Sequence, residues 1–235
     1  MKNLQQIRTG RAGIIGMICL LAAAFSSCSK VHNDDIVVTP SALISVVDAC
    51  PDAGSLDFFL DNNMANTNPI VYGNGLDYLR AYTGKRTATF YVSGTSQKIK
   101  TDTMTLKDGK FYTLFLSNVA SKADYLLTID TLTNPGTTNT QIRLVNLSPD
   151  APAVDLAIQG GATVATNRAY RTISSFSTIT PNTYTLEVRQ KGTTTVLASI
   201  PGVKLYGASL YTVWLQGSAA SSTLAAKLQL NAYYY

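Results

Sequence analysis

Two pairs of aspartates in this 235-residue chain have the residue type and spacing for chemistry, and they lie in two related stretches. Asp52 and Asp57 belong to residues 48–58, and Asp150 and Asp155 hold the corresponding places in residues 146–156. Two carboxylates that approach each other are the usual catalytic groups of glycoside hydrolysis. The duplication favours a structural role instead, because an Asp beside Pro in a turn accepts backbone N–H groups. The residues predicted to hold turns in place are Pro51, Asp52, Asp57, Pro149, Asp150 and Asp155.

Calcium is the alternative use for these carboxylates, since it prefers hard oxygen ligands. The first stretch offers three of them, Asp48, Asp52 and Asp57, whereas the second offers two, and neither has the spacing of an EF-hand loop. Metal sites built on His and Cys are excluded from the predicted domains, because the one histidine, His32, precedes them. The sequence therefore predicts no metal site and no cofactor.

Nucleophilic catalysis lacks its usual partners in this chain. With no His in the predicted domains, there is no imidazole to activate a Ser or Cys nucleophile. Cys50 stands where the second stretch has Ser148, which favours a small turn residue over a reactive thiol. No Gly-rich phosphate loop precedes a helix. We predict that the protein is not an enzyme.

Two aromatic residues are candidates for binding rather than catalysis. Phe115 and Trp214 lie in corresponding strands of the two halves, and the residues on both faces of these strands are largely apolar. One interpretation is a central strand that is packed on both sides. The other is that Phe115 or Trp214 forms an exposed platform for a sugar ring or a protein partner. Both interpretations stay open at this point.

The elements that would position these residues are short strands. Thr, Ser, Tyr, Val and Gly are common and Glu occurs once, which favours strands over helices. Six to eight strands in each half, with frequent turn signals, predict an all-β protein of two tandem immunoglobulin-like β-sandwich domains. We place these domains at residues 42–133 and 141–235, with a linker at 134–140. The Gly- and Asn-rich residues 62–84 are predicted to form turns.

The N-terminus has the features of a secretory signal over residues 1–27, with a basic start and an apolar run from Ala12 to Phe25. The run ends in Ser26, Ser27 and Cys28, which resembles the lipobox of bacterial lipoproteins. That resemblance implies a lipid on Cys28 and a tether over residues 28–41, so the membrane becomes a partner. The alternative is cleavage after Ala22–Ala24 and release of a soluble secreted protein. We expect an outer-membrane lipoprotein, on the periplasmic or the surface face.

Residues 144–156 are similar to the hallmark of the domain-of-unknown-function family 4397, whose members occur in bacterial envelope and secreted proteins. The first stretch departs from it, with Asp48 in place of Asn, Cys50 in place of Ser and Gly54 in place of Pro. The resemblance implies tandem all-β domains outside the cytoplasm. It implies no activity and no catalytic residues.

Charge and composition narrow the function further. The formal charge of +5 includes Lys2, Arg8 and Arg11 of the predicted signal, and the remaining basic residues are scattered, so nucleic acid is excluded as a partner. We expect a lipid-anchored cell-envelope protein that acts as a non-catalytic binding, adhesive or structural module. Its partners would be envelope proteins or glycans. The alternative is a carbohydrate-binding accessory lipoprotein of a glycan-uptake system.

Overall fold

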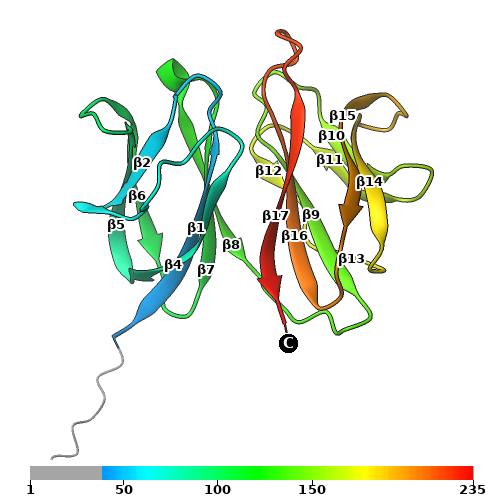
Figure 1. The fold of residues 1–235 in the computed structure, drawn as a ribbon, viewed down its shortest axis with the longest axis horizontal. Coiled ribbons are helices and arrows are strands. Elements are labelled where there is room, and N and C mark those ends of the chain that lie inside the picture. The colour runs from blue at the N-terminus through cyan, green and yellow to red at the C-terminus, as the bar shows by residue number, and fades with distance from the viewer. Residues whose placement is uncertain (1–38, 235) are drawn as a thin grey trace, which may run out of the picture. The chain divides into compact units, whose positions relative to one another are not determined.

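The computed structural model describes residues 39–234, which are almost entirely strands and connecting turns (Figure 1). The predicted signal at 1–27 and most of the predicted tether at 28–41, including Cys28, lie outside the described residues. Residues Thr39–Tyr235 form one compact unit. Within the described residues the structure has no helix with the length and apolar character that a membrane crossing needs. The predicted all-β fold with β-sandwich domains is confirmed.

The first sandwich has two four-stranded sheets, in the orders β4-β1-β7-β8 and β3-β2-β5-β6. A short 3₁₀ turn, Ala120–Lys122, connects β7 to β8. The strands are β1 (Ser41–Ala49), β2 (Leu56–Leu60), β3 (Asn63–Met64), β4 (Gly75–Tyr82), β5 (Gly84–Val92), β6 (Lys98–Leu106), β7 (Phe111–Ser117) and β8 (Asp124–Asp130).

The second sandwich repeats this plan, with sheet orders β12-β9-β16-β17 and β11-β10-β14-β15 and with β13 also pairing to β9. Its first strand begins at the last residue of the predicted linker. The strands are β9 (Thr140–Asn146), β10 (Val154–Ile158), β11 (Thr163–Arg168), β12 (Thr172–Ile173), β13 (Ser177–Ile179), β14 (Thr183–Gln190), β15 (Val196–Lys204), β16 (Ser209–Gln216) and β17 (Ala225–Tyr233).

Each sandwich has its own core, built from the alternation of side chains along its strands. In β2, Leu56 and Phe58 are fully buried, and Phe58 packs against Phe90 of the paired strand β5 with ring centroids 5.0 Å apart. In the second sandwich, Leu156 of β10 and Val188 of β14 form the corresponding pair. The buried residues recur at every second position, as expected for strands that turn one face to a core.

Residues 62–84 contain two strands besides the predicted turns, because β3 and β4 lie within them. β4 pairs with β1 at the edge of its sheet, and its exposed positions include Asp77 and Arg80. An edge strand with charged outward residues lacks the apolar pattern that reveals a central strand. Gly75 starts β4 beside Val46, where an added Cβ would lie 2.2 Å from the Val46 carbonyl oxygen. The glycine that suggested a turn is thus needed for close approach of two strands.

The sheets that contain β1 and β9 are buried on both faces. The two central strands of each sheet pair in parallel, β1 with β7 in the first sandwich and β9 with β16 in the second. One face of each sheet covers its own sandwich core. The opposite faces meet each other in a third apolar cluster, made of Val47, Ala49 and Phe115 from the first sandwich and Val145, Leu147 and Trp214 from the second. We call this contact the junction.

The junction corrects one of the two interpretations of the aromatic residues. Phe115 is 0% exposed and Trp214 is 2% exposed, so neither ring is available as a platform for a sugar or a protein. Both are packed on two sides, as the other interpretation proposed. Their burial follows from apposition of two sheets, because a strand covered on both faces needs apolar residues at successive positions.

Candidate functional site

The duplicated Pro-Asp turns hold distant loops against the sandwiches. Oδ1 of Asp52 accepts a hydrogen bond of 2.7 Å from the backbone N–H of Ala120, 68 residues away. Asp150 accepts hydrogen bonds from Ser218 Oγ at 2.6 Å and from the N–H groups of Ala219 and Ala220. Ser218 is also 68 residues from Asp150, so the two turns contact corresponding loops. These hydrogen bonds, with Ser218 the strongest contributor, lower the pKa of Asp150 to about 2.

The second Asp of each stretch fastens a different loop. Asp57 accepts the N–H of Gly94 at 3.0 Å and the hydroxyl of Ser93 at 2.9 Å. Asp155 accepts the N–H of Gly192 at 2.8 Å, again 37 residues further along the chain. It also accepts the N–H of Asn167 at 2.7 Å. The carboxylates that could have formed a catalytic pair are therefore engaged by separate loops.

Asp48 begins the first stretch, and its environment differs from that of its counterpart Asn146. Oδ1 of each accepts an N–H two residues on, from Cys50 at 2.8 Å and from Ser148 at 3.0 Å. Nδ2 of Asn146 also donates to the carbonyl oxygen of Arg168 at 3.1 Å. Oδ2 of Asp48 is buried without a hydrogen-bond partner among the described residues. Burial raises the pKa of Asp48 to about 7, against the opposing effect of the Cys50 N–H.

Cys50 is the free thiol of the described residues, and it is fully buried. Burial and the nearby charges of Asp48 and Asp52 raise the pKa of Cys50 to about 12. Its Sγ lies 3.7 Å from Oδ1 of Asp52, where Ser148 donates to Asp150 at 3.2 Å in the second sandwich. A thiol that stays protonated is a poor nucleophile. Cys50 therefore acts as a turn residue, in the position that Ser148 has in the second sandwich.

The junction contains a buried ion pair at one side. Arg143 of β9 lies 2.7 Å from Asp130 of β8, and their side chains are 4% and 0% exposed. Nε of Arg143 donates to Thr212 Oγ1 at 2.8 Å, and the guanidinium lies 4.6 Å from the ring centre of Phe176. Oδ2 of Asp130 accepts hydroxyls from Thr113 and Tyr78, each at 2.6 Å. Asp130 thus has the hydrogen-bond donors that a buried charge requires, whereas Nη2 of Arg143 contacts Asp130 in the ion pair and has no hydrogen-bond partner among the described residues.

A cavity of about 480 Å³ opens beside this ion pair. We call it the junction cavity, since both sandwiches contribute to it. Ile129, which is 58% exposed, comes from the first sandwich, and Arg143 and Phe176 come from the second. Oε1 of Gln141 has no hydrogen-bond partner among the described residues. The complete lining is Ile129, Thr131, Thr133, Gln141, Arg143, Ile173, Ser174, Ser175 and Phe176.

A second hollow lies on the outer face of the sheet that contains β2 and β5. Phe59 and Tyr91 meet edge to face there, with ring centroids 5.3 Å apart. They line a hollow of about 530 Å³ together with Asp57, Asp61 and residues of the following turn. Phe59 alternates with the buried Phe58 and therefore shares the outward face of Asp57. That alternation was the signal for an outward aromatic, and the sequence analysis missed it.

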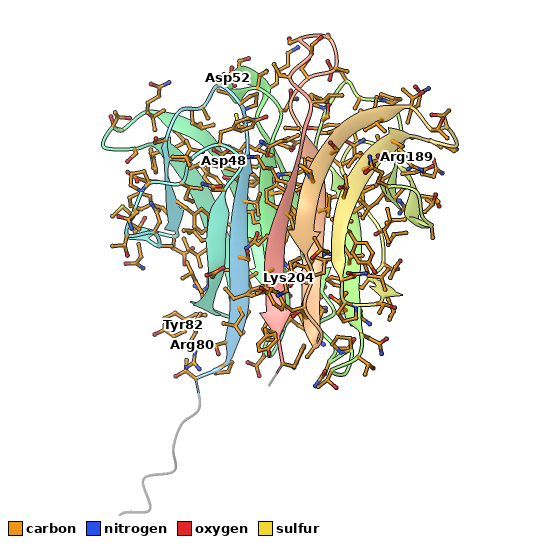
Figure 2. The ribbon with its side chains drawn as sticks, turned by 45° about the vertical axis from the view of Figure 1, so that its right-hand side comes forward. Asp48, Asp52, Arg80, Tyr82, Arg189 and Lys204 are labelled. Atoms are coloured by element: carbon orange, nitrogen blue, oxygen red, sulfur yellow. The ribbon has the colours of Figure 1, made fainter. Side chains whose placement is uncertain are left out.

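The candidate site residues thus fall into three places. The Asp residues of the duplicated stretches lie at the ends of strands and hold loops, and Figure 2 shows Asp48 and Asp52 toward the end opposite to Arg80 and Tyr82. Phe115 and Trp214 lie in the junction. Arg143, Gln141 and Phe176, which the sequence analysis did not select, line the junction cavity. Among residues 39–234, no three side chains of His, Cys, Asp or Glu lie close enough together to hold a metal ion.

A comparison with protein families gives one match over part of the chain. Residues 42–157 match the model of the family described as Domain of unknown function (DUF4397). The match supports this family for these residues. The matched range contains both Pro-Asp turns, because it runs through the first sandwich and ends in β10 of the second. The comparison with curated proteins found no match.

Among solved structures, the chain is similar to one described as the crystal structure of CBMbc (family CBM26) from Eubacterium rectale Amy13K in complex with maltoheptaose. The sequence identity is 8%, and the alignment covers 82% of this chain and 97% of that chain. The TM-score is 0.26, so this likeness gives no argument about what the present protein binds.

Proposed function

We propose that this protein is a lipid-anchored cell-envelope protein whose two sandwiches act as a non-catalytic binding or structural module. We further propose that it is an outer-membrane lipoprotein of the DUF4397 family with tandem copies. The observation that carries the non-catalytic part is the state of the reactive groups. The four Asp side chains of the duplicated turns are occupied by backbone N–H and hydroxyl donors from loops, and the thiol of Cys50 is buried and protonated.

The exposed basic residues around the start of β1 support the anchor. β1 starts at Ser41, whose N–H donates to Oδ1 of Asp108 at 2.7 Å, and this end of the first sandwich lies opposite to the turn of Asp52 (Figure 2). Exposed basic residues surround the start of β1, because Ser41 pairs with Tyr82 and lies beside the loop between β6 and β7. A basic end facing an anionic bilayer would be attracted to it. The exposed basic residues at this end are Arg80, Lys85, Lys107 and Lys110.

The anchor is tested by replacing the lipid acceptor. Cys28→Ala should move the protein from the membrane fraction to the soluble fraction and abolish labelling by a fatty-acid analogue, because no acyl chain is then attached. A matched control is Cys50→Ser, which places the counterpart residue in a buried turn and should leave labelling unchanged. Membrane retention of the Cys28→Ala protein together with persistent labelling would contradict the anchor.

The non-catalytic role is tested with the full chain carrying Cys28→Ala, incubated with glycoside, ester and peptide substrates. We expect no turnover above the rate with heat-unfolded protein. Turnover that Asp150→Asn abolished while the fold persisted by circular dichroism would contradict the proposal. The second candidate function, a carbohydrate-binding accessory lipoprotein of a glycan-uptake system, is favoured by the chemistry of the junction cavity.

A further inference from the structure

The junction cavity combines the two kinds of surface that a sugar ring requires. Ile129, Ile173 and Phe176 supply apolar area for the C–H faces of a ring. Side chains of Thr131, Thr133, Ser175 and Gln141 supply hydroxyl and amide groups that donate and accept hydrogen bonds. A volume of about 480 Å³ lies within the range of small-molecule sites. The lining is therefore neither an apolar groove nor a purely polar surface.

The charges in the cavity wall indicate a neutral ligand. Arg143 is the cationic group of the lining, and it is already paired with Asp130 at 2.7 Å. An anionic ligand would have to compete with this buried carboxylate for the same guanidinium. A cationic ligand would find no free carboxylate, because Asp130 also accepts the hydroxyls of Thr113 and Tyr78. Neutral hydroxyl groups avoid both costs.

Two polar atoms of residues in the wall, Oε1 of Gln141 and Nη2 of Arg143, lack a hydrogen-bond partner among the described residues, although Nη2 of Arg143 lies 2.7 Å from Oδ1 of Asp130 in the ion pair. Oε1 of Gln141 is buried without a hydrogen bond, and a buried acceptor in that state is destabilising. Rotation of the amide toward the cavity would let Oε1 accept a hydroxyl from a ligand. The counterpart of Gln141 in the first sandwich is Leu43, so the amide is specific to this side of the junction.

We propose that the junction cavity is a binding site for a neutral saccharide, and this inference rests on the proposed function of a non-catalytic binding module. The apolar faces of Ile129 and Phe176 would contact the ring, and Gln141, Thr131 and Thr133 would bind its hydroxyls. Because the lining comes from both sandwiches, the site exists only when the two are joined. The tandem arrangement would then have a purpose that one sandwich alone does not serve.

The test uses the full chain carrying Cys28→Ala, titrated by calorimetry with maltose, cellobiose, lactose, mannobiose and chitobiose, and with galacturonate as the charged comparison. Two variants change the cavity. Gln141→Leu places the counterpart residue and removes the amide, and Phe176→Ala removes the ring. Phe59→Ala is the matched control, because it removes an aromatic from the outer-face hollow and leaves the cavity intact. Thermal unfolding of each variant verifies that it is folded.

We expect saturable binding of at least one neutral disaccharide and none of galacturonate. Each cavity variant should raise the Kd about tenfold, which corresponds to the loss of about one hydrogen bond or ring contact, whereas Phe59→Ala should leave the Kd unchanged. Binding lost in Phe59→Ala and retained in the cavity variants would overturn the inference and place the sugar on the outer face. Absence of binding to every saccharide would overturn it too and leave the non-catalytic module standing. Hydrolysis of a saccharide would instead overturn the proposed function.

Discussion

The two sandwiches share the hydrogen bonds that hold their loops and differ in the residues that face each other. Asp52 and Asp150 reach loops 68 residues away, and Asp57 and Asp155 reach loops 37 residues away. In the junction, by contrast, Ser45 stands where the second sandwich has Arg143. The loop contacts recur because each sandwich has to hold its own loops. The junction residues differ because the two sandwiches form one junction between them.

The junction has approximately equivalent contacts from its two sides, as an interface between similar copies does. Ser117 and Tyr170 bond through their hydroxyls at 3.1 Å, and Tyr72 and Gln216 are neighbours at the corresponding place, where neither Oη of Tyr72 nor Nε2 of Gln216 has a hydrogen-bond partner among the described residues. The sides differ where charge is buried. Arg143 pairs with Asp130 on one side, whereas Ser45 accepts a hydrogen bond of 3.3 Å from Gln229 on the other. The two sides of the junction are therefore not equivalent in buried charge.

The largest expected effect comes from giving the second sandwich the residue of the first. Arg143→Ser removes one member of a buried ion pair and leaves the carboxylate of Asp130 uncompensated. We expect the free energy of unfolding to fall by about 3–5 kcal/mol, measured by urea denaturation. Arg143→Ser combined with Asp130→Asn removes both charges and should recover much of the loss. Equal destabilisation in the single and double variants would mean that the charges are not coupled.

The next effect is the pH dependence introduced by Asp48, which Asn146 lacks. The unfolded chain releases this proton near pH 3.8, whereas the folded protein holds it to about pH 7. The contribution of Asp48 to the free energy of unfolding is therefore fully present below pH 3.8 and is lost as the pH rises through 7. Asp48→Asn should abolish this fall in the free energy of unfolding with pH and stabilise the protein at pH 8 by on the order of 2–4 kcal/mol.

Urea denaturation between pH 4 and pH 8 measures this difference. Tyr72, Cys50 and Asp52 are the titratable neighbours of Asp48, and the pKa values of Tyr72 and Cys50 are raised by burial, so both stay neutral over this range. Asp150 contributes in the opposite direction, since its stabilisation is lost only as the pH falls from 3.8 toward 2. Identical pH profiles for Asp48→Asn and the unaltered protein would exclude Asp48 as the group responsible.

The smallest effect compares the two Pro-Asp turns. Asp150 accepts two backbone N–H groups and a serine hydroxyl from its loop, whereas Asp52 accepts one N–H. Asp150→Ala should lower the free energy of unfolding by about 1 kcal/mol, and Asp52→Ala by less. Hydrogen exchange at Ala219 and Ala220 should accelerate in the first variant, with exchange at Ala120 as the control. A larger loss in Asp52→Ala would reverse this ranking.

The core residues and most strands follow from the sequence because alternation is local. Leu56 and Phe58 share a face by the geometry of one strand, whatever else the chain does. β4 escaped the prediction because an edge strand carries charged outward residues and a glycine, which are also the residues of turns. Phe59 differs from Phe115 and Trp214 because its counterpart in the second copy is Ala157, so its outward direction is readable from the alternation but no duplicated aromatic marks it.

The sequence by itself determined that two copies of one all-β plan exist, where their cores lie, and which Asp residues lie beside turns. Those features depend on residues close in the chain or on a repeat within it. Only the tertiary structure decided that the sheets of β1 and β9 face each other, which buries Phe115 and Trp214 and brings Arg143 to Asp130. The physical reason is that an apolar strand face predicts burial, whereas the surface that buries it is formed by residues far away in the chain.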